Sequence, residues 1–245
     1  MFTEPYKLVN KNEKSAILIT CEHSSNRLPP SFSLPKRLIN SHWALDVGIS
    51  QVVDKVAEIL DCTAIKANYS RLIIDLNRHF HQETLIREKT SRTIPVMFNK
   101  NLSKKQIEER KNKIHKPYHD RIDSLVRELK KHHKQIILIC LHSFTPIYFG
   151  KPRNVGIGMM YNEHKRLAKH IGEELRKLGQ DVKYNEPYSA MQGEAYTAYT
   201  HGRNNNILWV EIETNNKLLR TEKGINKVAE DMAKVFKKTP LTYYK

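Results

Sequence analysis

The sequence lacks the features of a secreted or membrane-embedded protein. Its 245 residues include three cysteines, an odd number and too few for a disulfide framework. No long uncharged apolar run is present, and the mean hydropathy is −0.61, so we expect no membrane span. Residues 1–14 carry several charges and no apolar segment of the kind found in secretory signals. We therefore expect a cytoplasmic protein with reduced, buried cysteines.

Positive charge is in excess. Lys and Arg outnumber Asp and Glu by 42 to 26, which gives a formal net charge of +16. Such an excess is also found in proteins that bind nucleic acids. The lysines, however, fall mostly on segments with the pattern of exposed helical faces, and no basic-aromatic alternation accompanies them. We expect a solvated basic surface and no nucleic-acid interface, with a non-catalytic, basic polyanion-binding protein as the alternative.

Apolar runs alternate with helical patterns along the chain. The runs predict buried strands at 16–20, 63–67, 136–141, 155–160 and 207–212, and a short edge strand at 181–184. Helical spacing predicts helices over 45–60, 103–134 with a break or kink at Pro117, 167–178 and 225–236. Residues 79–102 predict a long loop over the active face, and 185–203 a binding loop. The pattern indicates the α/β class, as a single three-layer domain over residues 1–245 with a mostly parallel or mixed central sheet.

The segment 70–78 combines cationic side chains with apolar ones. Its apolar residues predict a strand end that passes through the interior, which places Arg71, Asn77 and Arg78 beside the core. Arginine is seldom buried without a partner. Asp75 can pair with one guanidinium group, and the remaining donors suit a bound carboxylate held by bidentate hydrogen bonds. The alternative is a cluster of surface salt bridges.

Two histidines follow predicted strands. His23 comes after the first strand, in a loop that ends in two prolines, and His142 comes directly after the most hydrophobic strand. Two histidines and one carboxylate are a usual ligand set of a hydrolytic zinc site. Such a site also needs a carboxylate base, and Glu211 in the last predicted strand can supply it. Asp46 falls in the first turn of a predicted helix, where compensation of the helix dipole is a sufficient explanation.

Five segments, in this order, resemble the N-formylglutamate amidohydrolase family, which is related to zinc carboxypeptidases and to the aspartoacylase and succinylglutamate desuccinylase group. They are Cys21-Glu22-His23-Ser24-Ser25, His42-Trp43-Ala44-Leu45-Asp46, Ser70-Arg71 with Asp75-Leu76-Asn77-Arg78, Leu141-His142-Ser143-Phe144 and Val210-Glu211-Ile212. The resemblance covers nearly the whole chain and implies a zinc carboxypeptidase-like fold. It also implies hydrolysis of the amide bond of a small, carboxylate-bearing N-acyl amino acid. A carboxypeptidase-like hydrolase of short peptides or cell-wall fragments is the alternative enzyme.

The resemblance implies a role for each candidate site residue. One zinc ion per chain would be bound by His23, Asp46 and His142. The base would be Glu211. The substrate carboxylate would be held by Arg71, Asn77 and Arg78, and His201 would lie near the substrate.

Three positions depart from the family patterns. The carboxypeptidases have a carboxylate three residues after the first histidine, where this chain has Asn26, so Glu22 is the alternative to Asp46 as the acidic ligand. Leu141 replaces an acidic residue of many members, which removes a possible hydrogen-bonding partner of the second histidine. The last strand often continues Glu-Ile-Arg, whereas this chain has Glu211-Ile212-Glu213. This change predicts an altered preference for substrate charge and leaves open which glutamate is the base.

Overall fold

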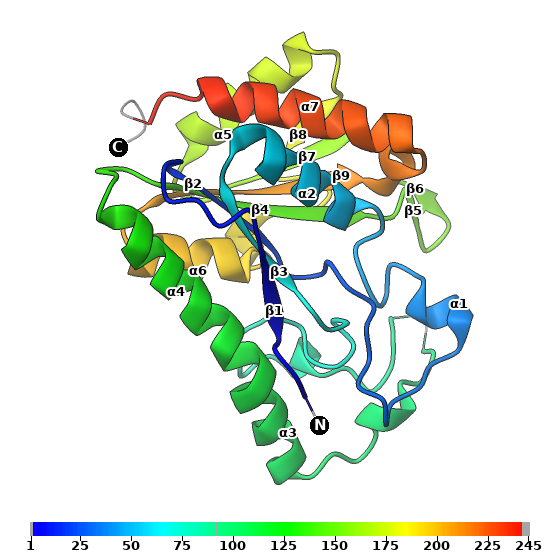
Figure 1. Ribbon diagram of the computed structural model, residues 1–245. Helices are drawn as coiled ribbons and strands as arrows, with labels where there is room; N and C mark the ends of the chain where they lie inside the picture. The colour runs from blue at the N-terminus through cyan, green and yellow to red at the C-terminus, as the bar shows by residue number, and fades with distance from the viewer. Residues whose placement is uncertain (1, 92, 242–245) are drawn as a thin grey trace.

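A seven-stranded sheet runs through the computed structural model, which describes residues 2–91 and 93–241 (Figure 1). Its strands are β1 (Tyr6–Val9), β2 (Ile17–Cys21), β3 (Thr63–Ala67), β4 (Ile137–Phe144), β7 (Ile157–Met160), β8 (Val182–Tyr184) and β9 (Leu208–Asn215). They lie in the order β1-β3-β2-β4-β9-β7-β8. The pairs β1–β3 and β7–β9 are antiparallel, and the other pairs are parallel. The sheet is therefore mixed, which confirms the prediction.

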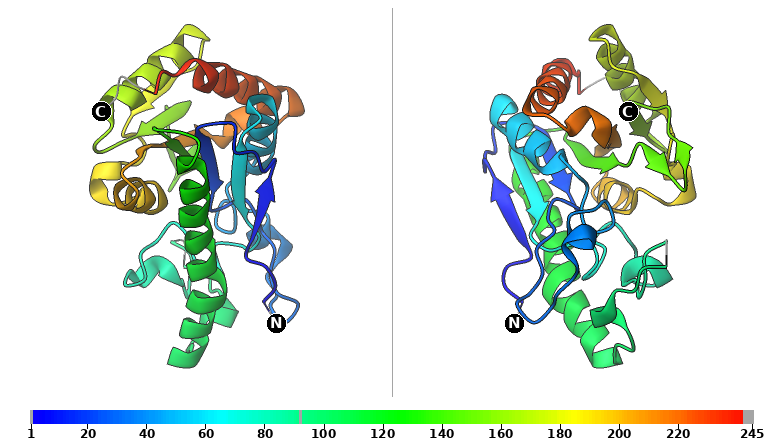
Figure 2. Two further views of the ribbon diagram at one scale, coloured as in Figure 1. Left: turned by 60° about the vertical axis from the view of Figure 1, so that its left-hand side comes forward. Right: turned by 90° about the vertical axis from the view of Figure 1, so that its right-hand side faces the viewer.

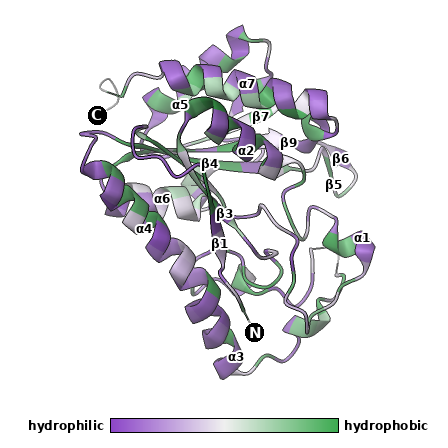
Figure 3. Cartoon of the chain, viewed as in Figure 1, coloured by the Kyte–Doolittle hydropathy of each residue, from purple (hydrophilic) through white to green (hydrophobic). Residues whose placement is uncertain are grey.

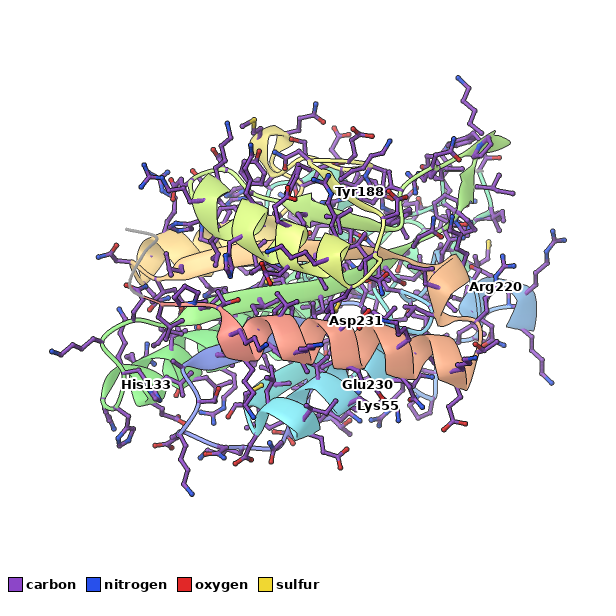
Figure 4. All side chains as sticks on the ribbon, turned by 90° about the horizontal axis from the view of Figure 1, so that it is seen from above. Lys55, His133, Tyr188, Arg220, Glu230 and Asp231 are labelled. Carbon is purple, nitrogen blue, oxygen red and sulfur yellow. The ribbon has the colours of Figure 1, made fainter. Side chains whose placement is uncertain are left out.

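Helices cover both faces of the sheet (Figures 1 and 2). One face carries α2 (Ile49–Leu60), α5 (Lys165–Lys177) and α7 (Glu222–Lys238). The other carries α4 (Lys116–Lys130) and α6 (Tyr196–Asn204). Seen from above, α7 lies between α2 and α5 (Figure 4). These three layers confirm the predicted fold class.

Shorter elements connect the layers. They are α1 (Lys36–Ile39), η1 (Glu83–Leu85), η2 (Met97–Asn99), α3 (Lys104–Arg110), the π-helical turn η3 (Lys111–His115), the hairpin of β5 (Ile147–Tyr148) and β6 (Lys151–Pro152), η4 (Ala190–Gln192) and η5 (Asn216–Leu219). The segments α3, η3 and α4 follow one another without interruption and form one long rod (Figure 1). Apart from η1 and η2, the loop predicted at 79–102 has no helix among its described residues.

Alternation along the central strands divides the core in two. In β4, Ile139 and Leu141 face α2, α5 and α7, whereas Cys140 faces α4 and α6. In β9, Val210 faces the first group of helices and Trp209 the second. Because side chains alternate between the faces of a sheet, residues 142, 211 and 213 all point toward the layer of α4 and α6.

The basic surface lies on outer helix faces. The outer sides of α4 and α7 are largely hydrophilic in Figure 3. Lys113 and Lys116 of the rod and Lys237 of α7 are exposed, and the first two pair with Glu109 and Asp120 along the rod. This arrangement agrees with a solvated basic surface. No helix within residues 2–91 and 93–241 has both the length and the apolar character needed to cross a membrane.

Several local predictions were wrong. Residues 70–78 form turns and not a strand end, although their apolar side chains are buried as expected. The elements β1 and α6 were missed, because β1 is an edge strand of four residues, none of them fully buried, and α6 lies in a segment rich in Tyr, Gly and Thr. Pro117, which was expected to break or kink the helix, does not break it. It occupies the second position of α4, where the preceding π-helical turn accommodates a residue without a backbone N–H.

Candidate active site

Three potential metal ligands converge at the carboxyl ends of β2 and β4. His23 follows β2, His142 lies near the end of β4, and Asp46 lies in the turn before α2. Nδ1 of His142 is 3.1 Å from Nδ1 of His23 and 2.9 Å from Oδ2 of Asp46. The third side, between Nδ1 of His23 and Oδ2 of Asp46, is 3.4 Å. We call this buried arrangement the ligand triangle.

The position of Asp46 corrects the prediction that it belongs to the first turn of a helix. The helix α2 begins at Ile49, and its N-cap is Gly48. Compensation of the helix dipole therefore does not account for Asp46. Its carboxylate instead accepts a hydrogen bond from the backbone N–H of Ser143 and lies 2.9 Å from Nδ1 of His142.

The ligand triangle has the dimensions of a zinc site. Zinc bonds of about 2.0–2.1 Å in a tetrahedron correspond to ligand separations of roughly 3.3–3.4 Å. The observed separations are 3.1, 2.9 and 3.4 Å. Two imidazole nitrogens and one carboxylate oxygen are also donors that zinc prefers. The residues present therefore fit a zinc ion.

A buried carboxylate lies behind each histidine of the triangle. Nε2 of His23 donates to Oδ1 of Asp75 at 2.7 Å, and Nε2 of His142 donates to Oε2 of Glu22 at 2.9 Å. These bonds leave both Nδ1 atoms facing the triangle, as in carboxylate–histidine–metal sites. Glu22 thus lies on the outer side of His142, away from the triangle. It supplies the partner that the resemblance led us to expect at position 141.

The electrostatics of the triangle favour a cation. Burial opposes ionisation of Asp46, but His23 and hydrogen bonds from both histidines outweigh it and hold the pKa of Asp46 well below its usual value. The pKa of Asp75 is likewise lowered, because Arg71 and His23 outweigh its burial. Burial lowers the pKa of His142, but three surrounding carboxylates raise it well above its usual value. The raised pKa of His142 thus reflects a negative potential that these carboxylates create at its ring.

Arg71 binds two carboxylates of the site itself. Its guanidinium group donates to Oδ1 of Asp46 at 3.3 Å and to Oδ2 of Asp75 at 3.0 Å. It therefore joins a predicted metal ligand to the carboxylate that orients His23. The side chain is 21% exposed and lines the cavity beside the triangle. Because a guanidinium group has five N–H donors, Arg71 can also reach a ligand in that cavity.

A cavity of about 230 Å³ lies beside the ligand triangle. Asn77 and Arg78 line it, together with Arg87 from the loop 79–102. Within the described part of the chain, neither Arg78 nor Arg87 forms an ion pair with a carboxylate. Burial lowers the pKa of Arg87, the charge of Asp75 opposes this effect, and the neighbouring arginines add to it. Two guanidinium groups that form no ion pair with the described carboxylates suit a ligand that carries a carboxylate.

Two glutamates of β9 lie near the triangle. The strand pairing places Glu213 beside His142 and Glu211 two residues deeper, beside Cys140. Glu213 lines the cavity, and its buried Oε2 has no hydrogen-bond partner among the described residues. Glu211 accepts a long hydrogen bond of 3.4 Å from Asn77. Burial raises the pKa of Glu211 to about 8 and that of Glu213 to about 7, a range that suits a general base.

Glu211 does not line the cavity. His201 does not line it either, whereas the other six predicted site residues do. It belongs to α6, and its two ring nitrogens are hydrogen-bonded to Asp123 and His119. Sequence reasoning missed Arg87, although it is a cationic residue in the loop that we expected over the active face. It also missed the outer roles of Glu22 and Asp75, which depend on contacts between distant segments.

The chain resembles known proteins over most of its length. The family model described as N-formylglutamate amidohydrolase matches residues 15–220. Gene product Atu2144 from Agrobacterium tumefaciens has 26% sequence identity and a TM-score of 0.90, with 97% of this chain and 95% of that chain covered. N-formylglutamate amidohydrolase from Ralstonia eutropha JMP134 has 17% identity and a TM-score of 0.74, with 95% and 96% covered. No curated protein sequence matches the chain. The match over residues 15–220 shows that the chain belongs to the N-formylglutamate amidohydrolase family.

Proposed function

We propose that this protein is a zinc-dependent amidohydrolase that cleaves the amide bond of a small N-acyl amino acid, with N-formylglutamate as the reference substrate. The family supports amide hydrolysis as the reaction. The observation that carries the zinc assignment is the triangle of His23, Asp46 and His142 with a carboxylate behind each histidine. The cavity of about 230 Å³ suits a small substrate better than a peptide.

Zinc, when bound, supplies a Lewis acid that polarises a carbonyl group and lowers the pKa of water. The side chains of the cavity supply binding and orientation. Asn77, Arg78 and Arg87 hold the substrate carboxylate and thereby fix the amide beside the triangle. Arg71 holds Asp46 in place and directs its remaining N–H groups toward the cavity.

A glutamate of β9 takes a proton from the attacking water and passes it to the leaving nitrogen. We assign this role to Glu211, as the resemblance implies. Glu213 is the second candidate, because it lines the cavity and has an oxygen without a hydrogen-bond partner in the described part of the chain. Glu211→Gln and Glu213→Gln, measured side by side, separate the two. Loss of the base should lower kcat about 10²- to 10⁴-fold with unchanged zinc content, and small effects of both substitutions would exclude β9 as its source.

Elemental analysis of protein purified without chelator tests the metal assignment. We expect about one zinc per chain in the wild type and its loss in His23→Ala and in His142→Ala. His132→Ala, at a histidine that is 54% exposed, is the matched control and should retain zinc. A wild-type protein without zinc, even after incubation with zinc, would contradict the proposal and favour a basic polyanion-binding protein.

Substrate comparison tests the second part of the proposal. We expect hydrolysis of N-formyl-L-glutamate and of related N-acyl amino acids that keep a free carboxylate. Hydrolysis of short peptides or cell-wall fragments, with no activity on N-acyl amino acids, would favour the carboxypeptidase-like alternative.

A further inference from the structure

A chain of hydrogen bonds lies behind the segment 75–78 and takes no direct part in the proposed reaction. Oδ1 of Asp123 is 2.7 Å from Nδ1 of His201, whose Nε2 is 2.8 Å from Nδ1 of His119. Nε2 of His119 is 3.0 Å from the carbonyl oxygen of Leu76. Both histidines are buried, whereas the Asp123 side chain is 34% exposed. We call this series the Asp–His–His chain.

The partners determine where the protons lie. The carbonyl of Leu76 can only accept, so Nε2 of His119 carries a proton. Burial, with His115 and His201 nearby, lowers the pKa of His119 well below its usual value, so this ring is neutral and its Nδ1 accepts. His201 must then donate from Nε2 to His119 and from Nδ1 to Asp123. The charge of Asp123 therefore supports the hydrogen bond to Leu76 at the far end of the chain.

A second histidine holds the same segment two residues further on. Nε2 of His115 donates to the carbonyl oxygen of Arg78 at 2.9 Å, and the His115 and His119 rings pack with centroids 4.3 Å apart. Asn77 lies between Leu76 and Arg78, whose carbonyl oxygens accept these hydrogen bonds. Its Oδ1 accepts a hydrogen bond of 2.9 Å from the backbone N–H of Thr197. The backbone that carries Asn77 and Arg78 is thus held by both α4 and α6.

We propose that Asp123, His201 and His119 are positioning residues for the substrate carboxylate. By holding the backbone at residue 76, they direct Asn77 and Arg78 into the cavity. Guanidinium and amide groups bind a carboxylate well only within a narrow range of positions, so a small backbone shift weakens binding. This inference rests on the proposed function, and it assigns His201 a role behind the binding segment without contact with the substrate.

Asp123→Asn tests the inference with little change in side-chain volume. Asn205 donates to the same oxygen of residue 123 at 2.8 Å, so the amide oxygen of the variant stays turned toward His201 and accepts from its Nδ1. A neutral His201 then has no proton on Nε2, and either two nitrogen lone pairs face each other or the bond to residue 76 is lost. We expect KM for N-formyl-L-glutamate to rise about 5- to 20-fold, while kcat changes less than about 2-fold and zinc content is unchanged. Asp120→Asn makes the same charge change at an exposed site of α4 and should alter none of these values.

A double-mutant cycle with Arg78→Ala distinguishes positioning from general loosening of the fold. If Asp123 acts through the binding segment, Asp123→Asn should raise KM less in the Arg78→Ala background than in the wild type. Nitrogen-15 NMR of the histidine rings gives a readout that is independent of activity. It should show both nitrogens of His201 protonated in the wild type, and only one in Asp123→Asn.

These experiments distinguish failure of the inference from failure of the proposed carboxylate site. If Arg78→Ala raises KM and Asp123→Asn does not, the inference is overturned and the proposed carboxylate site stands. Fully additive effects in the cycle, or a His201 ring protonated on one nitrogen in the wild type, would also overturn it. If Arg78→Ala itself leaves KM unchanged, the proposed carboxylate site is wrong and the inference falls with it.

Discussion

At the scale of the residue, the buried carboxylates of the site differ in how their charge is compensated. Asp46 and Glu22 remain ionised because histidines surround them and outweigh the cost of burial. Glu211 has the opposite balance, because burial dominates and raises its pKa to about 8. The ionised carboxylates of Asp46 and Glu22 favour the binding of a cation, whereas the carboxylate of Glu211, with its raised pKa, is suited to accept a proton.

The hydrogen bond between Glu22 and His142 gives a first prediction. Glu22→Gln replaces a charged acceptor by a neutral amide and should lower zinc affinity about 10- to 100-fold. Competition with a chromophoric chelator measures this affinity. Glu58→Gln, an exposed position on α2, is the control and should have the wild-type affinity. Equal affinities for all three proteins would show that Glu22 does not orient His142.

The raised pKa of Glu211 predicts a pH effect on the metal-free protein. Between an unfolded pKa of about 4.3 and the folded value of about 8, the folded state binds more protons, so the free energy of unfolding falls as pH rises. Thermal unfolding of chelator-treated protein should therefore give a lower Tm at pH 8 than at pH 5.5. Glu211→Gln, which resembles the neutral form, should reduce this difference. Glu230→Gln on α7 (Figure 4) should leave it unchanged.

At the scale of the element, the apolar runs in the sequence located the strands correctly but did not show where each strand ends. The strand β4 continues through His142 to Phe144, and β9 continues to Asn215, because each pairs with the other beyond the apolar run. Polar residues in these extensions look like loop residues in the sequence, yet they form the site. The helix α6 was missed for a related reason, since it packs through Gly202 and other small residues that give no helical pattern of large apolar side chains.

The site was predictable to the extent that it lies at strand ends. His23 and His142 could be identified because they follow predicted strands. Asp46 was identified as a ligand only through the family resemblance, because a residue in a turn has no periodic sequence pattern. Arg87 lies in a loop whose path is set by tertiary contacts. The bond between Asp123 and His201 joins residues 78 positions apart, and no local pattern indicates such a pairing.

The close approach of α6 to β9 gives a prediction for a whole element. A Cβ at Gly202 would lie 2.1 Å from Cδ1 of Trp209, so Gly202→Ala must push α6 away from the sheet. Overpacking costs about 1–3 kcal/mol, which exceeds the gain of about 1 kcal/mol in helix propensity. We expect Tm to fall by several degrees and KM to rise, because α6 carries His201. Asn204→Ala, exposed on the same helix, should change neither.

At the scale of the whole molecule, the ligand triangle joins parts of the chain that are far apart in sequence. Its residues come from positions 23, 46 and 142, and they meet only when β2 and β4 are paired and α2 has packed on the sheet. A metal bound there favours the folded state over the unfolded chain.

Metal binding should therefore stabilise the entire fold. Zinc at about 100 times its Kd adds roughly 2.7 kcal/mol to the free energy of unfolding, which raises Tm by about 5–10 °C for a chain of this size. Thermal unfolding with increasing zinc measures the shift. Magnesium prefers six oxygen ligands and should have no such effect. A zinc-induced shift that persists in His142→Ala would place the bound zinc elsewhere.

The order of strands in the sheet also has a consequence for synthesis on the ribosome. The predicted ligands belong to the first 142 residues, whereas Glu211 and Glu213 lie on β9, which inserts between β4 and β7. A nascent chain thus completes its ligand set well before the strand that carries the base has been translated. With the roles proposed above, a chain without β9 would leave amide bonds intact, and hydrolysis would begin only when this last strand enters the sheet.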